Sequence, residues 1–283
     1  MSTSNTSIRQ ALYEDPGPRA KKIIAVITTL SVAALVALGV AILHRFVMTG
    51  QFDERYWSFF TRPTTWRFLG QGLAGTLSAS TVAMLLAFLV GFLLMRGKMS
   101  PLAPLRRLCA ALVEFSRGVP TLLFIYFFFL VAPQLGLSLR AFWKITLPVA
   151  LSAAGIVAET LRSGVNAVPK GQWEAATALG FRKRSQFYLI IFPQALRYVV
   201  PSMISELVIV LKDTTFAYVV SYPDLMQNAK VLISNYDAML SVYLVVAVIY
   251  ILINYLLNRL ATRFARRNSS RNGGAALAPS ANY

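Results

Sequence analysis

The chain has 283 residues, of which 56% are hydrophobic and only 14% are charged. Soluble globular domains carry about a quarter charged residues, so this composition argues against a soluble protein and against a disordered chain. The single cysteine and the single histidine exclude a disulfide scaffold and a histidine-based metal site. The net charge of +17 would suit a nucleic-acid partner or the anionic surface of a membrane. The positions of the basic residues along the chain distinguish these two partners.

Apolar stretches long enough to cross a bilayer recur along the chain. A transmembrane helix needs about 20 mostly apolar residues at a rise of about 1.5 Å each. The stretches without a charged residue are 23–43, 68–95, 118–139 and 238–258, and those interrupted by charges are 142–165 and 198–222. The sequence therefore predicts an all-α, multi-pass protein of the cell membrane with about six transmembrane helices.

The two ends of the chain differ from these stretches. Residues 1–22 are rich in Ser, Thr and Pro, and we expect a disordered cytoplasmic tail there and at 263–283. The first apolar stretch, 23–43, exceeds the roughly 7–15 apolar residues of a signal peptide, and no small-x-small cleavage site stands out after it. It is therefore predicted to be a retained transmembrane helix.

Basic residues are distributed unevenly between the predicted loops. The segments that lie inside when the N-terminus is cytoplasmic are 1–22, 96–107, 166–197 and 259–283. These segments hold 18 of the 28 Lys and Arg residues, whereas the outside segments hold 6. The excess predicts that both termini are cytoplasmic, because basic loops stay on that side of the membrane. It also accounts for the net charge through membrane lipid headgroups, with no nucleic-acid partner.

The predicted cytoplasmic loop 166–197 contains a short helix. Residues 173–179 favour a helix, and Gly180 follows where a helix C-terminal glycine belongs. With Ala175 and Ala176 on its surface, this helix would let another backbone come close, so it is a candidate docking element. An ordinary interfacial helix that lies on the membrane is the alternative.

Several strings in the sequence resemble one family. The string Glu174-Ala175-Ala176-x3-Gly180-x9-Ile190-x2-Pro193 resembles the EAA loop of ABC importer permeases, with Phe192 in place of the more usual Leu. The strings that resemble its polar amino acid subfamily (histidine, glutamate, glutamine, arginine, opine) are Arg117-Gly118-Val119-Pro120-Thr121, Glu159-x2-Arg162-Ser163-Gly164 and Leu211-Lys212-Asp213-Thr214-Thr215. Val119 departs from the usual Thr. The resemblance runs from about residue 70 to 267, and within the subfamily the chain resembles a permease subunit of a glutamate importer.

The resemblance implies an architecture and a set of partners. Residues 68–262 would form a permease domain with a five-helix core, to which 23–43 adds one helix. A second permease subunit would complete a homo- or heterodimer, and an extracellular solute-binding protein would deliver the polar amino acid. Two cytoplasmic ATPase subunits, which bind ATP and Mg, would each receive a coupling helix. The residues that the resemblance assigns to ATPase coupling are Gln172, Glu174, Ala175, Ala176 and Gly180.

The sequence itself lacks the phosphate-binding motif that ATP hydrolysis needs. Its nearest string, Gly97-Lys98-Met99, has neither the upstream glycine spacing nor a Ser or Thr after Lys. This chain is therefore predicted to be a transport subunit without a bound cofactor of its own, and not an enzyme. If ATP drives transport, a partner must hydrolyse it.

Charged residues within the predicted spans are candidates for substrate binding, since a charge at mid-bilayer costs roughly 2.5–3.5 kcal/mol. Glu114 with Arg117, and Glu159 with Arg162, stand three residues apart on one helix face and would either neutralise each other or bind the two charges of an amino acid. The predicted substrate-pathway residues are Glu159, Arg162, Glu114, Arg117, Thr121, Lys212 and Asp213.

A helix break is also predicted beside these charges. Pro120 removes a helix hydrogen bond and Gly118 lowers helix propensity, so the helix should bend next to Arg117. A plain kink without function is the alternative interpretation. On physical grounds acidic, neutral and basic substrates all remain open. A secondary transporter driven by an ion gradient would also explain the charges within the spans, although it would not explain the EAA-like loop.

Overall fold

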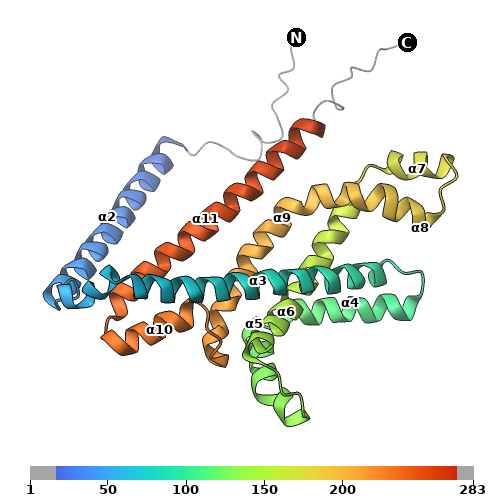
Figure 1. The fold of residues 1–283 in the computed structure, drawn as a ribbon. Helices are drawn as coiled ribbons and strands as arrows, with labels where there is room; N and C mark the ends of the chain where they lie inside the picture. Colours follow the sequence, from blue (N-terminus) through green and yellow to red (C-terminus); the bar gives the residue numbers. More distant parts are fainter. Residues whose placement is uncertain (1–16, 273–283) are drawn as a thin grey trace. The chain divides into compact units, whose positions relative to one another are not determined.

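The computed structural model describes the backbone of residues 17–272 and the side chains of residues 17–263. All regular elements within these residues are helices (Figure 1). The chain divides into two compact units, Met1–Trp57 and Ser58–Tyr283, and each is described by itself.

The first unit consists mainly of α2 (Pro18–Met48), followed by a 3-10 turn, η1 (Glu54–Tyr56). The 31 residues of α2 span about 46 Å, and none of them is buried within the chain. Pro18 suits the first helical position because its missing N–H would be unpaired there. Residues 18–22 are thus helical and do not belong to the tail predicted at 1–22, whose first 16 residues lie outside the described part.

The second unit is a helical bundle with short 3-10 and π-helical segments. Its α-helices are α3 (Pro63–Lys98), α4 (Ala103–Gly118), α5 (Thr121–Tyr126), α6 (Ala141–Ala167), α7 (Lys170–Ala178), α8 (Lys183–Ser185), α9 (Phe192–Asp213), α10 (Leu225–Tyr236) and α11 (Met239–Asn272). The remaining segments are η2 (Ser58–Thr61), η3 (Phe127–Val131), η4 (Ala132–Leu135), η5 (Gln186–Ile191) and η6 (Thr214–Val220).

Fewer helices than predicted are long and apolar enough to cross a membrane. Among the described residues, α2, α3, α6 and the Met239–Arg263 part of α11 meet both conditions. A fifth candidate is the pair Ala103–Gly118 and Thr121–Leu135, which is bent by 98°. The predicted span 198–222 corresponds to α9, which carries four charged residues and ends at Asp213, so it does not meet these conditions. The count is four or five where the sequence predicted about six.

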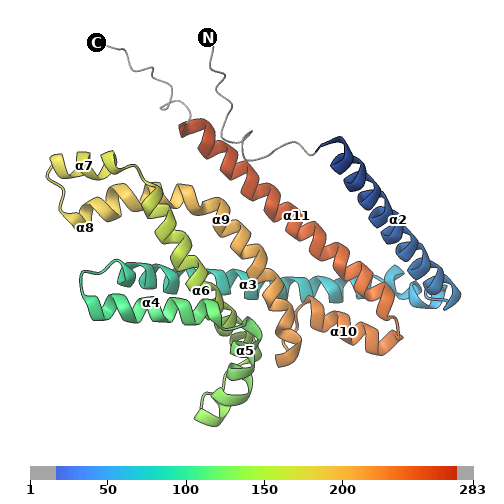
Figure 2. The same cartoon turned by 180° about the vertical axis from the view of Figure 1, so that it is seen from behind.

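Helix α6 is central to the second unit, since it packs against α3, α4, α5 and α9. Figures 1 and 2 show it crossing between these helices, with α3 and α4 antiparallel beside it. Many of its buried residues are small: Ala150, Ala153, Ala154, Gly155, Ala158 and Gly164. Small residues let helix backbones approach closely, and such packing holds helices together where no hydrophobic effect acts between them.

Two glycines of α6 mark the closest approaches. A Cβ added at Gly155 would lie 2.9 Å from the carbonyl oxygen of Val113 on α4. A Cβ at Gly164 would overlap Val199 of α9 and lie 2.9 Å from the carbonyl oxygen of Ala195. Because backbone atoms cannot yield as a flexible side chain does, α6 fits its neighbours only with glycine at these positions.

Helix α11 extends beyond the predicted span. It continues to Asn272, so residues 263–272 are helical and do not belong to the tail predicted at 263–283. The physical reason is that the sequence has no Gly or Pro between Arg259 and Asn272 to end the helix. The rest of that predicted tail lies outside the described residues.

We predict that Gly164→Ala destabilises the protein, because the added methyl group must push α9 away from α6. Overpacking of this kind costs about 1–3 kcal/mol. Thermal unfolding in detergent should show a lower midpoint for this variant. Gly70→Ala on α3 is the matched control, since no atom lies within 4 Å of its added Cβ. Equal midpoints for Gly164→Ala and the unaltered chain would contradict the close packing.

Candidate functional site

The path of the chain bends sharply between α4 and α5, as the sequence predicted. α4 ends at Gly118, Val119 is extended with φ −90° and ψ 125°, and Pro120 precedes the first residue of α5. Proline lacks an N–H and disfavours helical geometry in the residue before it. The predicted helix break is confirmed. At the bend, the C-terminal end of α4 and the N-terminal end of α5 lie close to α6 and α9.

A cavity of about 300 Å³ lies at this bend, and we call it the α4–α5 cavity. The residues that line it are Arg117, Gly118, Val119, Pro120, Thr121, Ser152, Ala153, Ile156, Glu206, Ile209 and Asp213. The Thr121 hydroxyl donates to Asp213 Oδ2 at 2.9 Å and lies 2.8 Å from the Ser152 hydroxyl, which must then donate to it. These bonds hold α5, α6 and α9 together around the cavity.

The cavity brings charges of both signs together from two helices. Arg117 comes from α4, while Glu206 and Asp213 come from α9, where their spacing of seven residues puts them on one face. The side chain of Glu206 is only 6% exposed. Arg117 Nη1 also lies 3.5 Å from Glu114 Oε1, so the predicted i, i+3 pair forms. Carboxylates and a guanidinium in one cavity match the ammonium and the carboxylate of an amino acid.

The other predicted pathway residues lie outside this cavity. Glu159 forms an ion pair with Lys98, at the end of α3, instead of pairing with Arg162. The reason is that α3 ends beside α6, so the carboxylate meets a cation from another helix. Arg162 and Lys212 are exposed and do not line the cavity. Glu159 therefore links α6 to α3, and it does not form the expected charge pair with Arg162 on one face of α6.

Two polar side chains of the cavity, those of Glu206 and Ser152, were not among the predicted pathway residues. Glu206 had a signal in the sequence, since it is an acidic residue in an apolar stretch seven positions before Asp213. Ser152 had none, because a serine within a transmembrane helix more often bonds to its own backbone. Its role depends on the position of Thr121, which only the tertiary structure supplies.

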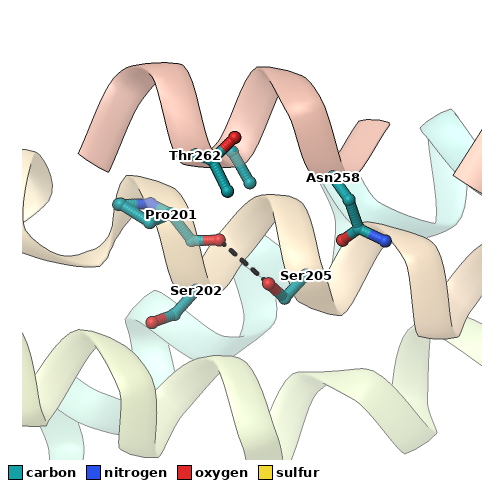
Figure 3. Close-up of a pocket in the computed structure, with 6 residues that line it drawn as sticks. Pro201, Ser202, Ser205, Asn258 and Thr262 are labelled. Atoms are coloured by element: carbon teal, nitrogen blue, oxygen red, sulfur yellow. Dashed lines mark hydrogen bonds between the residues drawn. The ribbon is translucent and has the colours of Figure 1, made fainter. Parts of the chain in front are cut away.

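A second hollow, of about 370 Å³, lies between α9 and α11 (Figure 3). Its polar lining consists of Ser202, Ser205, Asn258 and Thr262. The Ser205 hydroxyl donates to the Pro201 carbonyl oxygen, and that of Thr262 to the Arg259 carbonyl oxygen. These hydroxyls are satisfied by their own helices and no charged residue lines the hollow, so the α4–α5 cavity is the stronger candidate for binding a charged substrate.

The predicted coupling helix is α7, and its end has the expected geometry. Gly180 has φ +78°, in the left-handed region that favours glycine. The N–H of Phe181 donates to the Ala176 carbonyl oxygen at 3.1 Å and that of Gly180 to the Thr177 carbonyl oxygen at 2.9 Å. This pattern is a Schellman motif, which ends α7 and turns the chain back toward η5.

The exposure of the α7 residues differs in part from the prediction. Glu174 and Ala175 are exposed, and Leu179 is 75% exposed. Ala176, expected on the surface, is only 1% exposed, because the chain folds back over that side of the helix. Gln172 is exposed and accepts a hydrogen bond from Gln194 Nε2 at 3.1 Å. A partner can therefore contact Glu174, Ala175 and Leu179, while Ala176 packs inside the chain.

Polar and aromatic contacts fix α7 to the bundle. The buried Gln186 donates to the Thr177 hydroxyl at 3.0 Å and to the Phe181 carbonyl oxygen at 2.9 Å. Phe187 belongs to the π-helical turn η5. The guanidinium carbon of Arg96, from α3, lies over its ring at 4.1 Å from the ring centroid. No feature of the sequence indicated these links, which join the end of the loop to α3.

The fold and the cavity define a helical membrane transport subunit, and comparison with known proteins specifies its family. Residues 83–270 match the family described as binding-protein-dependent transport system inner membrane component, and the chain belongs to it. It is an ABC importer permease for amino acids and an integral membrane protein.

Individual transport proteins and a solved structure are also similar to this chain. The chain is 34% identical to the glutamate transport system permease protein GluD of Corynebacterium glutamicum, over 63% of this chain and 67% of that protein. It is 33% identical to the probable glutamine ABC transporter permease protein GlnP of Bacillus subtilis, over 58% and 76% respectively. The solved structure of an amino acid ABC transporter with histidines superposes with a TM-score of 0.68 at 27% identity, over 74% of this chain and 98% of that chain.

We predict that the Lys98–Glu159 pair stabilises the fold and does not bind substrate. Loss of one partner leaves a partly buried charge unpaired, which should cost about 1–3 kcal/mol after allowance for its partial exposure. A double-mutant cycle with Lys98→Met and Glu159→Gln, followed by thermal unfolding, should give a double variant less destabilised than the sum of the single variants. Additive effects, together with a raised KM for uptake in Glu159→Gln, would assign Glu159 to the substrate path instead.

Proposed function

We propose that this chain is the transmembrane permease subunit of an ATP-driven importer of a polar amino acid, with glutamate as the substrate. It would form half of the translocation path and couple to a separate ATPase through α7. The observation that carries the proposal is the α4–α5 cavity, where Arg117 meets Glu206 and Asp213.

The charges of the cavity suit an amino acid as a zwitterion. The α-ammonium group of the substrate would bind between Glu206 and Asp213, and the α-carboxylate would bind Arg117. Thr121 donates to Asp213 and thereby fixes the direction of that carboxylate. Glu206 is buried, so a charge-assisted bond to it would be stronger than the same bond at an exposed surface.

Glutamate sets a further requirement on the complete path. It carries two carboxylates and one ammonium, whereas this cavity offers one guanidinium and two carboxylates. The side-chain carboxylate of glutamate must therefore bind a cation or a helix N-terminus contributed by a second permease subunit. Support for glutamate comes from the similarity to GluD, and the similarity to GlnP makes glutamine the first competitor to test.

Coupling would pass through the surface of α7. Glu174, Ala175 and the exposed Leu179 would dock in a cleft of the ATPase, and Gly180 would set the angle at which the chain leaves the helix. Gln172 and Ala176 would support α7 from within the chain. Closure of two ATPase subunits on ATP would then move two coupling helices together and rock the permease halves from inward- to outward-facing.

The proposed assembly follows from this function. It comprises a second permease subunit, two cytoplasmic ATPase subunits that bind ATP and Mg, and an extracellular solute-binding protein. The excess of basic residues at 96–107 and 166–197 supports a cytoplasmic position for α7 and for both termini.

The experiment that tests the function is uptake into proteoliposomes that contain this chain and its partner subunits. Labelled glutamate should accumulate only when ATP is hydrolysed, and an uncoupler of ion gradients should leave the rate unchanged. Uptake that needs no ATP and collapses with the uncoupler would identify an ion-gradient-driven transporter and overturn the proposal.

We predict that Glu206→Gln raises the KM for transported substrate at least ten-fold, because the variant lacks one of the two charges that hold the ammonium group. The loss of one charge-assisted hydrogen bond, about 1.5–3 kcal/mol, corresponds to this change. Glu114→Gln is the control, since Glu114 contacts Arg117 but does not line the cavity. An unchanged KM in a normally assembled Glu206→Gln transporter would remove Glu206 from the substrate site.

We predict that Gly180→Ala lowers substrate-stimulated ATP hydrolysis and uptake together, because an alanine at φ +78° strains the Schellman turn that positions Leu179. Gly171→Ala, at the start of α7, is the matched control, since its φ lies outside the left-handed range and its added Cβ meets no atom within 4 Å. Both variants should bind substrate as the unaltered chain does. Equal uptake in the two variants would count against the role of this turn in coupling.

A further inference from the structure

A groove runs between α3 and α4 and begins at the turn that joins them. Its first part, about 590 Å³, is walled by Leu94 of α3 and by Leu105 and Cys109 of α4. Arg96 and Ser100 lie at its turn end. The groove therefore combines an apolar wall with a polar, basic end.

The groove continues along α4 into a second cavity of about 180 Å³, which shares the Leu94 wall and adds Leu112 and Ser116 of α4. The α4 residues Leu105, Cys109, Leu112 and Ser116, which line the two cavities together with Phe115, are spaced three to four apart, so they form one face of the helix. These 11 residue steps cover about 16 Å, close to half of the roughly 30 Å hydrocarbon core of a bilayer. The length of the groove thus matches the acyl chain of a lipid in one leaflet.

Basic side chains surround the turn end of the groove. Arg106 is held there by a hydrogen bond from its Nη1 to the Ser100 carbonyl oxygen at 3.3 Å. Arg96 lines the groove, and its guanidinium carbon lies 4.1 Å from the centroid of the Phe187 ring, a cation–π contact that leaves the N–H groups of the guanidinium available to a phosphate. Lys98, near the same turn, forms an ion pair with Glu159. Within residues 17–263, no acidic side chain forms an ion pair with Arg96 or Arg106.

We propose that this α3–α4 groove binds one anionic phospholipid. Its phosphate would lie between Arg96 and Arg106, near Ser100, and one acyl chain would follow the face of α4 from Leu105 to Ser116. Charge complementarity selects this occupant, because basic pockets between transmembrane helices attract anionic headgroups. A zwitterionic lipid would bring a second cation to the two arginines, and a free phosphate would leave the apolar walls empty.

The test uses the full chain, purified in a mild detergent and stripped of lipid. It is incubated with phosphatidylglycerol, phosphatidylcholine of the same chain length or glycerol phosphate, and native mass spectrometry records the bound molecules. One phosphatidylglycerol should be retained at higher occupancy than phosphatidylcholine, and glycerol phosphate should not be retained. Equal occupancy of the two lipids, or retention of glycerol phosphate, would overturn the proposal.

Two matched variants separate this groove from general surface charge. Arg106→Gln should weaken phosphatidylglycerol binding roughly five-fold, the effect of about 1 kcal/mol per basic residue near a lipid surface. Arg107→Gln makes the same change in charge one position away, outside the groove lining, and should have little effect. Because Arg106 is exposed, its variant should keep the thermal midpoint of the unaltered chain. An equal loss in both variants, or no loss in Arg106→Gln, would show that the groove does not select the lipid.

Discussion

The close approach of α6 to α4 and α9 is the interaction on which the rest of the second unit depends. At Gly155 and Gly164 the neighbouring backbones leave no room for a Cβ, so the helices contact each other through main-chain and small side-chain atoms. Dispersion between atoms at this distance replaces the hydrophobic effect, which is absent between helices in lipid. The middle of α6 carries Ser152 at the α4–α5 cavity, and its C-terminal end, at Ala167, leads into the loop of α7. About 22 Å of tightly packed helix therefore joins the two candidate sites.

Contacts between side chains near α7 also connect this helix rigidly to the rest of the second unit. Glu159 of α6 pairs with Lys98 of α3, and Arg96 of α3 stacks on Phe187 of η5. A displacement of α7 would thus reach α3 and α6 together, because each link joins two different elements. At the opposite end, Thr121 joins α5 to α9 through Asp213. In the proposed importer, the cavity and the docking helix belong to one packed body, and transport requires that this body move against a second subunit.

The sequence predicted those features that follow from local chemistry. Apolar runs located the long helices, Pro120 located the bend, and the glycine after residues 173–179 located the left-handed turn at Gly180. Contacts between distant segments escaped prediction: Glu159 finds Lys98, 61 residues earlier in the chain, and Thr121 finds Asp213, 92 residues later. Ala176 is buried because the loop folds back on itself, which no spacing in the sequence indicates. Of the roughly six predicted spans, four or five meet the conditions of length and apolar composition, and α9 does not because it carries four charged residues.

A distance measurement within and between subunits tests the rigid connection most directly. Spin labels at Ala175 on α7 and at Ile156, beside the cavity, would be introduced into a Cys109→Ser chain assembled with its partner subunits. The account predicts that the Ala175–Ile156 distance within the chain is the same without nucleotide and in an ATP-trapped state, while the distance between the α7 helices of the two permease subunits shortens. A distance within the chain that changes with nucleotide, at a constant distance between the α7 helices, would contradict it.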